Sequence, residues 1–171
     1  DDEVCCEASR QEIIRRYFHT ACDTRQGDSD PAELQKLEML MRSAGIETSM
    51  RATVPAALTA AEVTGGPAAA IELDDGTIIT GHNSDLLGAM SAALLNALKH
   101  LAGIDHSIKL LSPTVLTPIQ QLKVEHLGSR NPRLHTDEVL LALSICAVPN
   151  PVVALALEQL DKLRGCQVHS S

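Results

Sequence analysis

The chain has 171 residues, enough for one domain or for a domain with a small helical annex. Aromatic residues make up 1% of it and the formal net charge is −8, so it has neither a base-stacking platform nor a basic stripe for nucleic acid. No apolar run reaches the roughly 18 residues of a transmembrane helix, so we expect a cytoplasmic protein without a membrane partner.

The five cysteines are odd in number, irregularly spaced, and form no Cys-x-x-Cys pair. This pattern argues against a disulfide scaffold and against a structural zinc site. We expect reduced, mostly buried thiols and no cofactor or metal. The chain begins Asp1-Asp2-Glu3, without Met or a signal peptide, which predicts an internal piece of a longer protein.

The first part of the chain predicts helices. Apolar residues at helical spacing indicate a helix over residues 3–26, ending at Gly27. A second helix begins where Asp30 can act as the N-cap and Pro31 occupies the first helical position, and it ends at Gly45. A short helix is expected over residues 55–63. The break that follows places a domain boundary after Gly66, so residues 1–66 form a helical annex.

The second part, residues 67–171, predicts an α/β domain. Runs at 69–73 and 77–80 flank Asp-Asp-Gly and indicate a β-hairpin, followed by a long buried helix over residues 85–101 with Ser84 as its cap. We expect a strand at 108–111 and a helix at 113–127. Thr136 should cap a helix over 137–147, and a last helix should end at Gly165. Residues 166–169 resemble the first half of a strand, so we expect the domain to be truncated at its carboxy end.

This order of hairpin, long helix, strand and helix resembles the core of the cytidine-deaminase-like fold. The fold class implied is helix-rich α/β (α+β), with a three-layer core and an amino-terminal annex. Leu87-Gly88-Ala89-Met90-Ser91-Ala92 stands where those enzymes carry a metal ligand and the proton-shuttling Glu, and residues 113–117 stand where they carry Pro-Cys-x-x-Cys. Met and Thr cannot supply the ligands that Zn²⁺ requires, so the resemblance implies a fold without zinc hydrolysis.

A second resemblance covers nearly the whole chain. It is carried by residues 1–5 and 11–17, by 54–58 and 84–89, and most specifically by the stretch Ser-Arg-Asn-Pro-Arg-Leu-His-Thr-Asp-Glu-Val-Leu at 129–140. The chain is similar here to the carboxy-terminal region of the bacterial domain-of-unknown-function family 1846. The resemblance implies an additional amino-terminal region with a Gly-rich, phosphate-binding type of loop, and it implies no reaction.

The polar loop at 129–135 is the best candidate site. Arg130, Asn131 and Arg133 offer donors to a phosphate or carboxylate, and His135 offers acid–base chemistry near neutral pH. Thr136 follows these residues at the expected start of a helix. The unpaired N–H groups at the amino terminus of a helix also favour anions. The structural alternative is equally coherent: Thr136 caps the helix, and the acidic residues after it complement the helix dipole and pair with the arginines.

A second polar run, Asn83-Ser84-Asp85, lies where a deaminase-like fold opens its pocket. These three side chains are candidate ligand contacts. The alternative interpretation is a turn followed by a helix cap.

Two hypotheses of function follow. In the first, the chain forms one wall of an anion or nucleotide-type site for a phosphorylated small molecule, with His135 as the candidate catalytic residue and the other wall in the amino-terminal region of the same protein. In the second, it is a non-catalytic module for interaction or homo-oligomerisation. A polar cleft lined by Arg130, Arg133 and His135 would favour the ligand site, and a large exposed apolar face would favour the interface. The sequence does not decide whether the protein is an enzyme.

Overall fold

The computed structural model describes residues 1–171, and the chain divides into two compact units, Asp1–Ala52 and Thr53–Ser171. The sequence placed a boundary after Gly66. The difference between the two divisions is helix α3 (Thr53–Thr64), which packs on the sheet of the second unit. No helix combines the length and the hydropathy needed to cross a bilayer.

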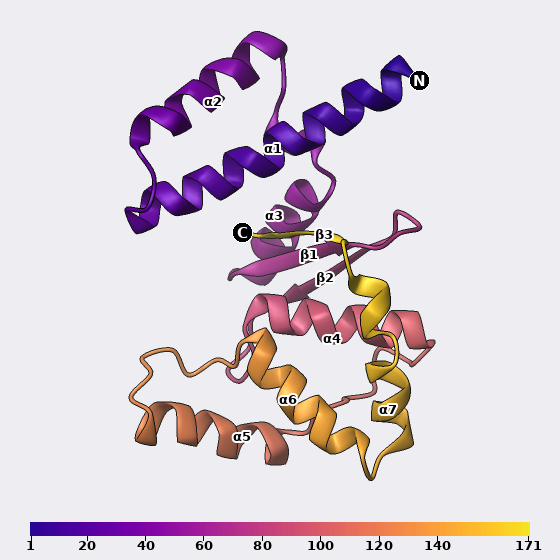
Figure 1. Cartoon of the computed structure of the whole chain (residues 1–171). Coiled ribbons are helices and arrows are strands. Elements are labelled where there is room, and N and C mark those ends of the chain that lie inside the picture. The colour runs from indigo at the N-terminus through magenta and orange to yellow at the C-terminus, as the bar shows by residue number, and fades with distance from the viewer. The chain divides into compact units, whose positions relative to one another are not determined.

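The first unit is a pair of helices, α1 (Asp2–Gln26) and α2 (Pro31–Ala44), that pack against each other (Figure 1). The predicted start and stop signals are confirmed. Gly27 adopts the left-handed conformation that ends α1, with φ of 87°. The Asp30 side chain accepts the N–H of Ala32 at 2.9 Å and begins α2. A small core of Ile14, Met41 and Ile46 holds the pair together, and a 3₁₀ turn, η1 (Thr48–Met50), follows.

The second unit contains a three-stranded antiparallel sheet in the order β2-β1-β3. The strands are β1 (Ala68–Glu72), β2 (Ile78–His82) and β3 (Gln167–Ser170). The hairpin between β1 and β2 is confirmed, and its turn has the expected chemistry. Gly76 takes a positive φ of 83°, and Asp75 Oδ1 accepts the N–H of Thr77 at 2.9 Å.

Helices α3 and α4 (Ala89–Ala102) cover opposite faces of this sheet (Figure 1). Strand β1 is buried on both faces, which suits its small residues Ala68, Ala69 and Ala70. Strand β2 approaches α4 so closely that a Cβ at Gly81 would lie 2.1 Å from the backbone nitrogen of Ala93. Small residues on both elements therefore set the spacing between sheet and helix.

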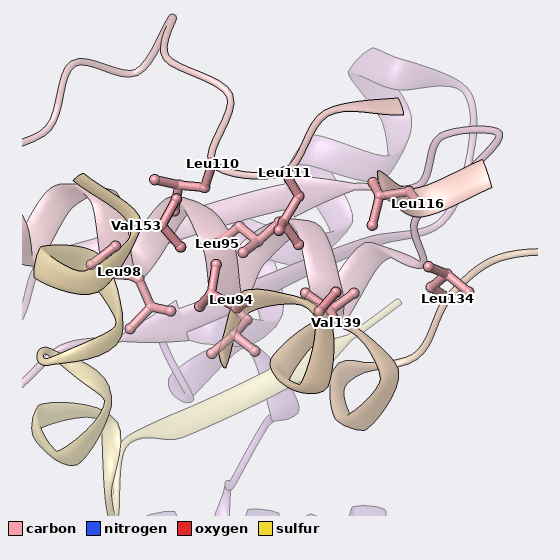
Figure 2. Packing of buried hydrophobic residues seen from close by; sticks show 12 residues of the cluster. Leu94, Leu95, Leu98, Leu110, Leu111, Leu116, Leu134, Val139 and Val153 are labelled. Atoms are coloured by element: carbon pink, nitrogen blue, oxygen red, sulfur yellow. The ribbon is translucent and has the colours of Figure 1, made fainter. Parts of the chain in front are cut away.

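A helical layer packs on the other side of α4. It comprises α5 (Pro113–Gln121) with its π-helical continuation η2 (Leu122–His126), then α6 (Thr136–Ala147), α7 (Pro151–Leu157) and the 3₁₀ turn η3 (Leu160–Leu163). The main core lies between these helices and α4, and it is aliphatic, as the composition requires (Figure 2). Leu98 on α4 and Leu143 on α6 are fully buried in it.

The predicted strand at residues 108–111 is wrong. The Asp105 carboxylate accepts both the N–H and the hydroxyl of Ser107 and turns the chain there. The ammonium of Lys99 then donates hydrogen bonds to the carbonyls of His106 and Ile108, and the Ile108 carbonyl is an acceptor that a strand ladder would use. Leu110 and Leu111 enter the helical core instead (Figure 2). The structure therefore shows a helix-rich α+β unit with a purely antiparallel sheet, and the deaminase-like core is not shown.

Three predicted helix boundaries also differ. Helix α4 begins at Ala89 with Gly88 as its N-cap, rather than at residue 85 with Ser84 as the cap. Helix α6 has His135, not Thr136, at its N-cap. The last predicted helix ends at Leu157 and is followed by η3.

Candidate functional site

The run Asn83-Ser84-Asp85 lies in an irregular segment that connects β2 to α4. Ser84 closes a local turn: its N–H donates to the carbonyl of Leu87 at 2.9 Å, and its hydroxyl accepts the N–H of Leu87 at 3.1 Å. Asn83 donates its backbone N–H to the carbonyl of Pro67. Ser84 thus shapes the segment before α4 instead of capping the helix.

The polar loop at 129–135 is organised by Asn131. Its Oδ1 accepts the N–H of Arg133 at 3.1 Å, a local turn in which a side chain replaces a backbone acceptor. Its Nδ2 lies 3.5 Å from Nε2 of His135, and Ser129 Oγ accepts the Asn131 N–H at 3.3 Å. Asn131 therefore folds this loop by local hydrogen bonds.

The two polar segments predicted separately lie side by side in the structure. Nε of Arg133 donates to the carbonyl of Ser84 at 2.7 Å. The next residue, Leu134, is fully buried and donates its N–H to Leu86, while its carbonyl accepts the N–H of Gly88. Gln120 on α5 bridges the segments by donating to the carbonyls of Asp85 and Pro132. An isolated parallel β-bridge between Leu87 and Leu134 joins the two segments.

At the amino terminus of α6, the Glu138 carboxylate accepts the backbone N–H of His135 at 2.7 Å, as in a capping box. The same carboxylate oxygen accepts a hydrogen bond from Lys123 Nζ at 2.9 Å. Lys123 also donates to the carbonyl of Arg133 at 2.7 Å, and it is only 6% exposed. A carboxylate therefore already occupies the helix terminus at which an anion was expected to bind.

The predicted site residues do not converge on a cleft. Arg133 is half-buried and directs its Nε at the Ser84 carbonyl, whereas Arg130 is exposed and forms no ion pair. His135 and Asp85 are exposed, and Thr136 is half-buried. Their arrangement supports the structural interpretation of the loop, with the correction that the cap is His135.

A pocket of about 300 Å³ opens beside this junction, between α4, the segment after β2 and the approach to α5. Of the predicted site residues, Ser84 lies in its wall. Two charged residues that the sequence did not single out, Lys99 and Lys109, also line it. Lys99 is 8% exposed and donates to the carbonyls of His106 and Ile108 at 2.8 and 3.2 Å. Burial lowers the pKa of Lys99, and Asp105 opposes this shift. Ser91, Asn96 and His100 are also polar residues of the stretch 89–102, so nothing in the sequence singles out Lys99.

No group of three or more His, Cys, Asp or Glu side chains is placed to hold a metal ion. All five cysteines are free, and Cys5, Cys6 and Cys22 are exposed, so the expectation of mostly buried thiols is wrong. Burial, together with Asp74 and Glu72, raises the pKa of the Cys166 thiol, which makes it a weaker nucleophile at neutral pH.

An apolar face remains uncovered on α6. Leu141, Ile145 and the residue that follows the helix, Val148, are 67%, 70% and 86% exposed. At 100° per residue they lie within about 60° of one another around the helix axis. We call these three residues the α6 stripe. Val152 and Leu155 on α7 are exposed as well.

These features define a helix-rich α+β protein with a polar junction, a small pocket and an uncovered apolar stripe. The profile described as "Domain of unknown function DUF1846, C-terminal" matches residues 49–171, and its amino-terminal counterpart matches residues 1–45. The chain therefore belongs to the DUF1846 family. That description assigns no activity.

The curated relatives are bacterial UPF0371 proteins. The chain is 55% identical to the one from Corynebacterium aurimucosum, 56% to that of Corynebacterium efficiens and 51% to that of Streptococcus thermophilus, in each case over all 171 residues. The matched region is 34%, 34% and 35% of the respective relative. The chain thus spans about a third of the length of the curated relatives it matches.

Proposed function

We propose that this chain is an interaction module, and that the α6 stripe packs against the part of the longer DUF1846 proteins that lies outside the chain. The observation that carries the proposal is the exposure of Leu141, Ile145 and Val148 on one face of one helix. Fully burying such a side chain contributes about 1.5–3 kcal/mol, so leaving three of them in water forgoes several kcal/mol.

The size of the stripe favours a tethered occupant over a second copy of the chain. Three side chains form a patch of a few hundred Å², whereas a stable complex between separate chains buries about 800 Å² on each partner. A segment of the same polypeptide is held at millimolar effective concentration, so a small patch is enough to dock it. The relatives supply such a segment, because two thirds of their length lies outside the matched region.

The ligand-site hypothesis for the polar loop has less support. It required a cleft lined by Arg130, Arg133 and His135, and Arg133 instead hydrogen-bonds to the Ser84 carbonyl. Glu138 and Asp137 bring negative charge to the helix terminus that was to receive the anion. The loop supports the proposed module by ordering the start of α6.

The test compares Ile145→Lys in two contexts: the 171-residue chain, and a chimera in which this chain replaces the matching region of the C. aurimucosum relative. In the chain alone the lysine stays in water, and the free energy of unfolding should change by less than about 0.5 kcal/mol. In the chimera the charge would be buried, and we expect a loss of about 2–4 kcal/mol in urea denaturation.

Val63→Lys is the matched control, because Val63 is 80% exposed on α3, away from the stripe. It should have a small effect in both contexts. Equal effects of Ile145→Lys in the chain and the chimera would contradict the proposal. A concentration-dependent dimer of the chain alone that Ile145→Lys dissociates would identify a second copy as the occupant instead.

A further inference from the structure

The pocket beside α4 is lined by aliphatic side chains and by two lysines. Side chains of Leu95, Leu110, Leu111 and Leu116 contribute to the wall, and all four belong to the buried core cluster drawn in Figure 2. Its polar lining consists of Ser84, Asn96, Lys99 and Lys109. Pockets that bind small molecules commonly have this composition, with an apolar body and a few polar groups that orient the ligand.

Lys99 lines the pocket and brings a positive charge to it. The residue is 8% exposed, and the two hydrogen-bond partners of its ammonium are neutral carbonyl oxygens, of His106 and Ile108. An ammonium has three N–H donors, so one remains for a further acceptor. Asp105 acts on this charge through space but forms no ion pair with it. Because burying a charge is costly unless a counter-charge compensates it, a bound anion would stabilise the ammonium further.

The other lining residues of the pocket also favour an anionic ligand. No Asp or Glu lines it, although the chain as a whole carries a net charge of −8. Lys109 is exposed and forms no ion pair, so its charge is available at the pocket. Asn96 donates its amide to the carbonyl of Thr80 at 3.0 Å, which fixes its side chain.

We propose that this pocket binds a small aliphatic molecule with one anionic head group, a carboxylate or a phosphate. The head group accepts hydrogen bonds from Lys99 and pairs with Lys109, and the aliphatic body lies against the leucines. Arg133 contributes indirectly: by holding the Ser84 carbonyl it positions the segment that forms part of the pocket wall. The site is independent of the α6 stripe and of its proposed occupant.

The experiment measures binding of octanoate to the 171-residue chain by isothermal titration calorimetry, with octyl phosphate, octanol and acetate as comparisons. Octanoate or octyl phosphate should bind at least about tenfold more tightly than octanol, which lacks the charge, and than acetate, which lacks the chain. The stronger of the two anions identifies the head group.

Lys109→Glu tests the site without disturbing the core, because Lys109 is exposed. It should raise the Kd at least about tenfold, and Lys99→Met should do the same, whereas Lys36→Glu, at an exposed lysine on α2, should leave the Kd unchanged. Three results would each overturn the proposal: no binding of either anion at millimolar concentration, equal binding of octanol, or equal effects of Lys109→Glu and Lys36→Glu.

Discussion

Replacing Gly81 with alanine should destabilise the second unit strongly. The added Cβ would lie 2.1 Å from the nitrogen of Ala93 and 2.6 Å from the carbonyl carbon of Ala92, whereas an ordinary contact begins at 3.4 Å. All of these atoms are backbone atoms of α4, so no side chain can rotate away. The helix and β2 would have to separate by about 1 Å, which loosens the core on both sides of α4. Overpacking of this kind costs about 1–3 kcal/mol or more, and we expect the upper end.

Thermal denaturation of the chain, followed by circular dichroism, measures this loss, and urea denaturation gives the free energy directly. At about 2–4 °C per kcal/mol, the melting temperature should fall by roughly 6–12 °C. Gly88→Ala is the control, because its Cβ would meet only the Leu134 carbonyl oxygen, at 3.5 Å. That variant should lose at most about 1 kcal/mol, since alanine is a poorer N-cap than glycine. A loss below about 0.5 kcal/mol for Gly81→Ala would refute the reasoning.

Two further predictions concern the site. Burial lowers the pKa of Lys99 from its ordinary value of 10.5, so between the lowered pKa and 10.5 the unfolded state binds more protons than the folded state, and folding stability should rise with pH across that window. Urea denaturation as a function of pH should show this rise in the natural chain and not in Lys99→Met. If the free energy of unfolding changes with pH in parallel in the two proteins, Lys99 does not cause the rise. The two arginines of the loop should also differ: Arg133→Ala should cost about 1 kcal/mol because its hydrogen bond to the Ser84 carbonyl is lost, while Arg130→Ala should change thermal stability by less than about 0.5 kcal/mol. Equal losses would show that the hydrogen bond does not account for the difference.

The parts of the fold that follow from local signals could be predicted from the sequence. Asp30 and Pro31 start α2, Gly27 ends α1, and Asp75-Gly76 turns the hairpin, because each acts on backbone groups only a few residues away. The segment at 108–111 could not be predicted in this way. Whether an apolar run becomes a strand depends on a neighbouring strand, and here Lys99 from α4 donates to the Ile108 carbonyl, which a neighbouring strand would need.

The candidate site was predictable only as two separate polar segments. The hydrogen bond from Arg133 to Ser84 joins residues 49 positions apart, and no local pattern indicates that contact. For the same reason the burial of Lys99 and Lys123 was missed, because both side chains appear in sequence as ordinary polar members of helices. The exposure of the α6 stripe was also unpredictable, since its residues fit a buried helix equally well.

The π-helical turn η2 has a consequence for how this protein can vary. A π turn holds one residue more than an α turn, and each added residue rotates the following side chains by about 100°. This turn includes Lys123, whose ammonium donates hydrogen bonds to the backbone carbonyl of Arg133 and to the carboxylate of Glu138. Deleting Leu122 would move Lys123 back by one position, rotate its side chain by about 100° around the helix axis and turn its ammonium away from both partners. Although most of this turn is exposed, the helix that leads to Lys123 is therefore constrained in its number of residues.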